Sequence, residues 1–165
     1  MKYRYVILIG LVNFILMSTV FQILRINDAL PNLCIILSIV FLALYTDKHA
    51  YIYAVTCGVL QDVFLGKVLG INLLIYLLLV FTIVKLERVM FKGNFLTPIF
   101  LIAIGTLFYH FVFYILMFFL QSTIPLSLLI LKIITEVIYN SAIGLFVYAF
   151  VFKRLNGYKL GDFNA

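Results

Sequence analysis

Charged residues are scarce in this 165-residue chain: Asp, Glu, Lys and Arg make up 11% of it, whereas a soluble domain carries about 25%. Hydrophobic residues make up 66%, which excludes an ordinary soluble domain and indicates an integral membrane protein. Tryptophan is absent, and the formal net charge is +6. The basic residues lie at the ends of apolar segments and not among stacking aromatics, so we expect membrane lipids and no nucleic acid as partners.

The sequence also lacks the motifs of catalytic and metal sites. It contains no Walker-type loop, no Gly-x-Gly-x-x-Gly, no Ser-His-Asp arrangement and no His-Glu-x-x-His. His110 has no second His or Cys three or four residues away, and Cys34 and Cys57 fall inside apolar segments as small core residues. We therefore expect no enzymatic activity, no cofactor and no metal ion.

Long apolar segments fill most of the chain. They predict an all-α integral membrane protein that forms a single transmembrane domain over residues 1–165, with six transmembrane helices. The predicted helices cover residues 5–24, 31–46, 50–66, 71–84, 97–120 and 127–152. The first is long enough by itself to cross a hydrocarbon core about 30 Å thick at about 1.5 Å per residue. Pro31 suits the first position of the second helix.

The distribution of basic residues predicts the orientation. With both termini in the cytoplasm, nine basic residues fall on the cytoplasmic side and two on the outer side, which is a strong positive-inside bias. The nine are Lys2, Arg4, Lys48, Lys85, Arg88, Lys92, Lys153, Arg154 and Lys159, and the two are Arg25 and Lys67.

The stretch from Gly58 to Asn72 is the predicted centre of the protein. Four-residue spacing places Gly58, Asp62 and Gly66 on one helix face, where small residues let a neighbouring helix approach closely. A carboxylate on that face is expected to lie among helices, because a charge exposed to lipid is expensive. The segment from Gly66 to Gly70 is then a turn, and Asn72 opens the next helix.

A second polar group lies in the last predicted helix. Lys132, Glu136 and Asn140 recur every four residues and share one face. By rise per residue, Asp62 and Glu136 both fall in the outer half of the bundle, where Lys132 is placed to neutralise either carboxylate. Two interpretations stay open: a structural network of buried hydrogen bonds, or a transport or proton-relay site.

Several of these residues together resemble a known family. The order is Pro31-Asn32-Leu33, a short charged turn at Asp47-Lys48, Gly58-x3-Asp62-x3-Gly66, Leu69-Gly70-x-Asn72 with Tyr76, and later Tyr139-Asn140. This order resembles the rod shape-determining membrane protein family MreD over the whole chain, most specifically across residues 31–76.

The resemblance implies a multi-pass protein of the bacterial cytoplasmic (inner) membrane. It implies a non-enzymatic scaffold of the cell-wall elongation machinery that maintains rod shape by binding MreC. Through MreC it would be linked to the cytoskeletal filament protein MreB. Two peptidoglycan synthases, the glycosyltransferase RodA and a penicillin-binding transpeptidase, would complete the assembly. Gly58, Asp62, Gly66, Gly70 and Asn72 match the family motif and carry over as structural or interface residues.

Two other functions remain as alternatives. The family is similar in fold to the substrate-binding subunits of energy-coupling-factor importers, which suggests a vitamin-type small-molecule binding subunit with an outward-facing pocket. A proton-coupled carrier using Asp62 and Glu136 is the third hypothesis. Retention of a vitamin-sized ligand would favour the importer subunit, and uptake driven by the membrane potential would favour the carrier.

Overall fold

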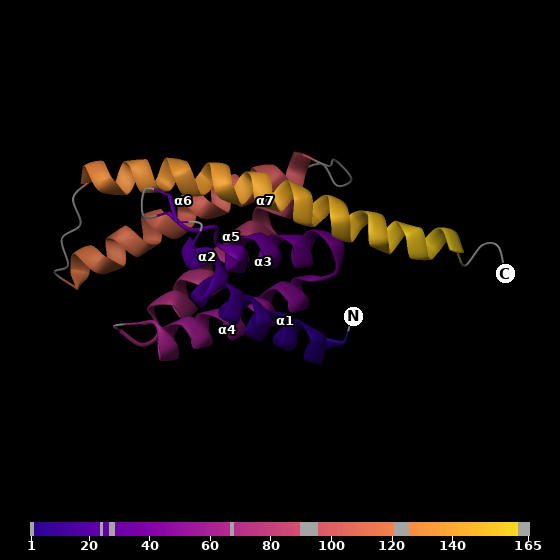
Figure 1. The fold of residues 1–165 in the computed structure, drawn as a ribbon, viewed down its shortest axis with the longest axis horizontal. Coiled ribbons are helices and arrows are strands. Elements are labelled where there is room, and N and C mark those ends of the chain that lie inside the picture. Colours follow the sequence, from indigo (N-terminus) through magenta and orange to yellow (C-terminus); the bar gives the residue numbers. More distant parts are fainter. Residues whose placement is uncertain are drawn as a thin grey trace.

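A computed structural model describes residues 2–23, 25–26, 29–66, 68–89, 96–120 and 126–161, with backbone alone for residues 89, 126–128 and 156–161. Within these residues the regular secondary structure is helical (Figure 1). The helices are α1 (Tyr3–Ser18), α2 (Val20–Ile23), α3 (Leu33–Leu44), α4 (Asp47–Phe64), α5 (Ile71–Val89), α6 (Leu96–Phe119) and α7 (Leu126–Gly161). Each of the six predicted segments therefore contains a helix.

The first predicted helix is divided into α1 and α2 at Thr19. The hydroxyl groups of Ser18 and Thr19 donate hydrogen bonds to the carbonyl oxygens of Phe14 and Ile15, at 2.8 and 2.7 Å. Such bonds from Ser and Thr to the preceding turn bend helices, and here they coincide with the interruption.

Helix starts differ from the predicted positions for reasons of capping. The second predicted helix begins at Leu33, because the side chain of Asn32 accepts from the backbone N–H groups of Cys34 and Ile35 and so acts as its N-cap. The third begins at Asp47, so the predicted turn at Asp47-Lys48 is wrong. Asp47 stands in the first helical turn, where a carboxylate interacts favourably with the helix dipole.

Helix α3 is the centre of the bundle. It packs against α1, α4, α5, α6 and α7, and its side chains Ile35, Ile36 and Ile39 are fully buried. In the described part of the chain, α1 and α7 both pack on α3 but not on each other. By their contacts the surrounding helices follow the order α1, α4, α5, α6 and α7, so α1 and α7 are the two ends of this series.

Among the described residues, three helical segments are long and apolar enough to cross a membrane: Tyr3–Ile23, Leu96–Phe119 and Leu129–Leu155. Helix α3 has 12 residues, so it is about 18 Å long and shorter than the hydrocarbon core. Helix α7 has 36 residues, is about 54 Å long and extends past the other helices toward the C-terminus (Figure 1). Both termini lie at the same end of the bundle (Figure 1).

The outward faces of the helices are apolar. Leu8 and Ile15 on α1, Phe111 on α6, and Ile138 and Phe146 on α7 are all more than half exposed. A soluble protein would place polar residues there, whereas a protein surrounded by lipid exposes such side chains without penalty. The surface therefore agrees with the composition in indicating a membrane protein.

Candidate functional site

The carboxylate of Asp62 caps the N-terminal end of α5. Its Oδ2 accepts from the backbone N–H groups of Gly70 (3.1 Å) and Leu73 (2.9 Å), and its Oδ1 accepts from the backbone and side-chain amides of Asn72 at 2.9 and 3.0 Å. The first N–H groups of a helix have no partners within the helix, and the positive end of the helix dipole favours an anion. Asp62, 3% exposed, is thus an N-cap supplied by the preceding helix.

At each of the three glycines around Asp62 the structure disfavours a side chain, either by a close contact or by the backbone conformation. A Cβ on Gly58 would lie 2.5 Å from the Cα of Leu73, and one on Gly66 would lie 2.7 Å from the carbonyl oxygen of Asp62. Gly70 has φ of 93°, a conformation that side chains disfavour. Because α4 ends at Phe64, Gly66 lies in the turn and not on the predicted common helix face, which holds Gly58 and Asp62 alone.

Asn72 continues the network from α5 to α6. Its Oδ1 accepts from the hydroxyl group of Tyr109 at 3.1 Å. The Tyr109 ring stacks on Tyr76 of α5, with centroids 5.4 Å apart and an interplanar angle of 25°. The Tyr76 hydroxyl lies 3.1 Å from Oε1 of Gln61 and accepts from Nδ2 of Asn32 at 3.2 Å.

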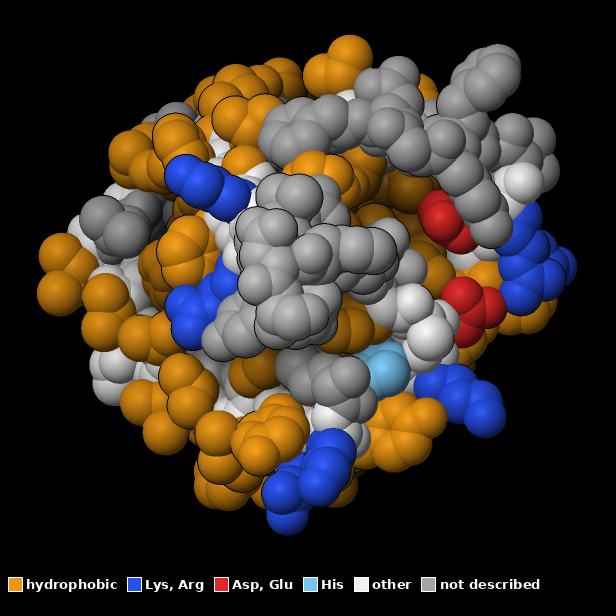
Figure 2. Space-filling model, turned by 90° about the vertical axis from the view of Figure 1, so that its right-hand side faces the viewer, with side chains coloured by type: hydrophobic (Ala, Val, Ile, Leu, Met, Phe, Trp, Pro, Cys, Tyr) orange, Lys and Arg blue, Asp and Glu red, His pale blue; other side chains and the backbone are white. Residues whose placement is uncertain are grey.

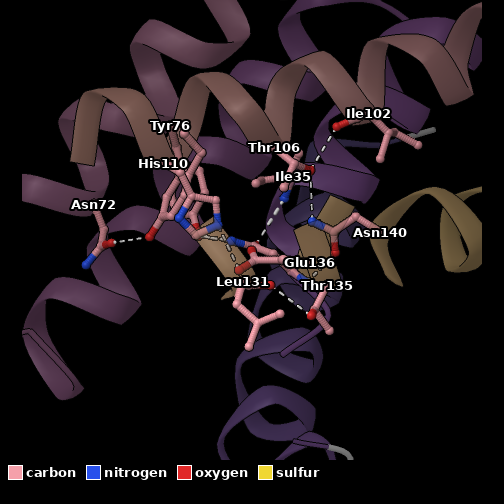
Figure 3. Close-up of polar contacts among 12 residues, drawn as sticks. Ile35, Asn72, Tyr76, Ile102, Thr106, His110, Leu131, Thr135, Glu136 and Asn140 are labelled. Carbon is pink, nitrogen blue, oxygen red and sulfur yellow. Dashed lines mark hydrogen bonds and ion pairs between the residues drawn. The ribbon is translucent and has the colours of Figure 1, made fainter. Parts of the chain in front are cut away.

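Asn140 ties α7 to the central helix. Its Oδ1 accepts from the backbone N–H of Asn32 at 2.7 Å, and its Nδ2 donates to Oγ1 of Thr106 at 2.9 Å. Thr106 in turn donates to the carbonyl oxygen of Ile102 (Figure 3). A single amide, fully buried, thereby joins α7 to α6 and to the N-cap of α3.

Glu136 pairs with His110, and not with Lys132 as the sequence suggested. Nε2 of His110 lies 2.9 Å from Oε2 of Glu136, and both residues are buried between α6 and α7 (Figure 3). Within the described residues Lys132 forms no ion pair with Glu136 or Asp62. Helices α4 and α7 do not pack on each other there either, and the hydrogen bonds that start at Asp62 lead through Asn72 to Tyr109 of α6.

We call these buried and half-buried polar residues the polar layer; they form three hydrogen-bonded groups, which meet at the ring contacts of Tyr109 with Tyr76 and His110. Its members are Asn32, Gln61, Asp62, Asn72, Tyr76, Thr106, Tyr109, His110, Glu136 and Asn140. They come from the start of α3 and from α4, α5, α6 and α7. The layer fixes the relative positions of five helices, because each buried polar group in it is held by a partner on another helix.

Sequence reasoning missed Gln61, Thr106 and Asn13. Gln61 donates to Sγ of Cys34 at 3.2 Å, as does Asn13 on α1 at 3.1 Å. Oδ1 of Asn13 is buried and, among the described residues, has no hydrogen-bond partner. The sequence could have indicated Gln61 and Asn13, because amide side chains are rare inside apolar segments and a polar side chain there is expected to find a partner.

A comparison with protein-family models gives a match over nearly the whole chain. The family model of the rod shape-determining protein MreD matches residues 1–157. The chain belongs to the MreD family. No curated protein and no solved structure gives a significant match. Membership in the MreD family makes this a membrane protein of rod-shape determination, and the polar layer is the internal organisation of that family member.

Proposed function

We propose that this MreD-family chain is a non-enzymatic scaffold of the cell-wall elongation machinery in the bacterial cytoplasmic membrane. It binds MreC directly and belongs to one assembly with MreB, RodA and a penicillin-binding transpeptidase. The observation that carries the scaffold role is the use of Asp62: both carboxylate oxygens accept hydrogen bonds from α5, so the charge is engaged in holding two helices together. A carrier would need that carboxylate free to exchange a proton or an ion.

The proposal includes six membrane crossings with both termini in the cytoplasm. Basic side chains gather around the end of the bundle where the termini lie (Figure 2). At this end the described helices carry Lys2, Arg4, Lys48, Lys85, Arg88, Lys153 and Arg154. The positive-inside rule supports the cytoplasmic assignment of that end.

The importer-subunit alternative receives less support. It needs a pocket on the outer side, whereas a cavity among Tyr45, His49 and Tyr148 lies at the end that carries the termini. The proposed similarity to importer subunits therefore rests on the family resemblance alone.

The experiment is co-purification of tagged protein from membranes with identification of proteins and bound small molecules. We expect MreC to copurify with the wild type and to be lost with Asp62→Ala at equal loading, whereas Asp47→Ala keeps it. Asp47 is a matched control because its carboxylate pairs with Arg88 at the exposed surface. A stoichiometric vitamin-sized ligand with no protein partner would overturn the scaffold proposal in favour of the importer subunit.

A further inference from the structure

A cavity of about 810 Å³ lies at the end of the bundle that carries both termini. It lies beyond the end of α3 at Leu44, beside the first residues of α1, α4 and α6. Leu42 and Ala43 of α3 and Pro98 and Leu101 of α6 form its apolar lining. A cavity of this volume is in the range that holds small molecules, about 300–1,000 Å³.

Aromatic side chains form much of the remaining wall. Tyr3 of α1, Tyr45 after α3, His49 of α4 and Tyr148 of α7 all line the cavity, and the ring of His49 lies against Tyr3 and Tyr45. Since α1 and α7 do not pack on each other in the described chain, helix packing does not seal the cavity on the side between them. This is the side on which a ligand from the membrane would approach the cavity.

The cavity wall carries charges of both signs that do not neutralise each other. Asp47 is paired with Arg88 at 3.0 Å. Glu87, half-buried, and Lys48, exposed, also line the cavity, and among the described residues neither has an ion pair or a hydrogen-bonded side-chain partner. Figure 2 shows acidic side chains beside the hollowed part of this face, with Lys and Arg around it.

We propose that this cavity binds a zwitterionic aminophospholipid, of the phosphatidylethanolamine type. The headgroup ammonium contacts Glu87 and the faces of the tyrosines, as cations contact aromatic rings in other proteins. The phosphate contacts Lys48, and the glycerol and upper acyl chains lie on Leu42 and Leu101. An anionic headgroup without an amine fits less well, because it leaves Glu87 unpaired. The inference does not depend on the proposed scaffold function.

The test is native mass spectrometry of protein equilibrated with equal amounts of phosphatidylethanolamine and phosphatidylglycerol. We expect the ethanolamine lipid to be retained preferentially, and Glu87→Gln to lower its retained fraction about fivefold, as for loss of one partly exposed charge-assisted hydrogen bond. Lys85→Gln is the control, because Lys85 lies on the same helix end and does not line the cavity. Equal retention of both lipids, or an unchanged fraction in Glu87→Gln, would overturn the proposal.

A second variant separates the cavity from the surrounding surface. Ala43→Phe places a large side chain at the lining and is expected to abolish selective retention while the protein still elutes as a single folded species. Persistence of selective retention in a folded Ala43→Phe variant would also overturn the proposal. Binding of a Lys-rich peptide in place of lipid would have the same consequence, since it would assign the site to a protein ligand.

Discussion

At the scale of the residue, Asp62 shows how a charge is kept inside a membrane protein. The carboxylate receives four hydrogen bonds from one helix end, three of them from backbone N–H groups that would otherwise have no partner. These hydrogen bonds compensate for the desolvation of the carboxylate, and they also give the first N–H groups of α5 an acceptor. Gly58, Gly66 and Gly70 make this geometry sterically possible.

Replacing Asp62 by Ala should lower the free energy of unfolding by about 3 kcal/mol or more, because several buried N–H groups lose their acceptor. Asp62→Asn should give a smaller loss, since one amide oxygen still accepts. The measurement is the temperature at which the detergent-solubilised protein loses its monodisperse elution peak. In Asp47→Ala, which removes an exposed ion pair and a carboxylate in the first turn of α4, a change of about 1 kcal/mol is expected. Equal stabilities for the Asp62 and Asp47 variants would contradict the N-cap role.

A second prediction concerns the close approach of α4 and α5. In Gly58→Ala the added methyl group meets the Leu73 backbone, so the helices must separate and stability should fall by about 1–3 kcal/mol. Val59→Ala changes the next residue on an exposed side of α4 and should have a small effect. The same elution assay measures both, and a Gly58→Ala variant as stable as wild type would show that the helices can separate without penalty.

At the scale of the helix, the sequence predicted some contacts and missed others for a definable reason. The unit from Gly58 to Asn72 is contiguous, so its four-residue spacing and its turn glycines restrict the geometry locally. The partner of Glu136 lies on another helix, and finding it requires the rotation of α6 and α7 about their axes. The spacing of Glu136 and Asn140 indicates the buried face of α7. Helix α6 is apolar on its buried side and on its lipid side, so no amphipathic pattern shows which of its residues faces Glu136.

The pair of His110 and Glu136 tests whether the polar layer is structural. His110→Ala leaves the Glu136 carboxyl buried without its partner and should destabilise the protein by about 3–5 kcal/mol. The double variant His110→Leu with Glu136→Leu removes both polar groups and should recover much of that loss, together with partner binding.

The comparison is made by thermal elution and by co-purification in parallel. Recovery of folding without any recovery of function in the double variant would contradict a purely structural role and would favour the proton-relay alternative.

At the scale of the whole molecule, helices α1, α4, α5, α6 and α7 pack on the short central helix α3. The long α6 and α7 lie along each other over much of their length (Figure 1). The proposed orientation predicts that a fluorescent protein fused after residue 161 matures in the cytoplasm. A periplasmic alkaline phosphatase fused at the same position should be inactive. A fusion within residues 66–70, between α4 and α5, should give the opposite result. Phosphatase activity at the C-terminus would overturn the orientation and, with it, the cytoplasmic position of the lipid cavity.

The capping of α5 by Asp62 also constrains biosynthesis. When α4 leaves the ribosome, the carboxylate oxygens of Asp62 have no donors, because Gly70 to Leu73 are still inside the exit tunnel. A carboxylate opposes translocon-mediated integration by about 3 kcal/mol at the centre of a segment, and by less at the position of Asp62, two residues before the end of α4. We expect residues 47–64 alone to integrate poorly in a glycosylation-reporter assay and residues 47–89 to integrate efficiently. The two segments would then enter the bilayer as one hairpin, so the order of synthesis is part of how this acid reaches its place.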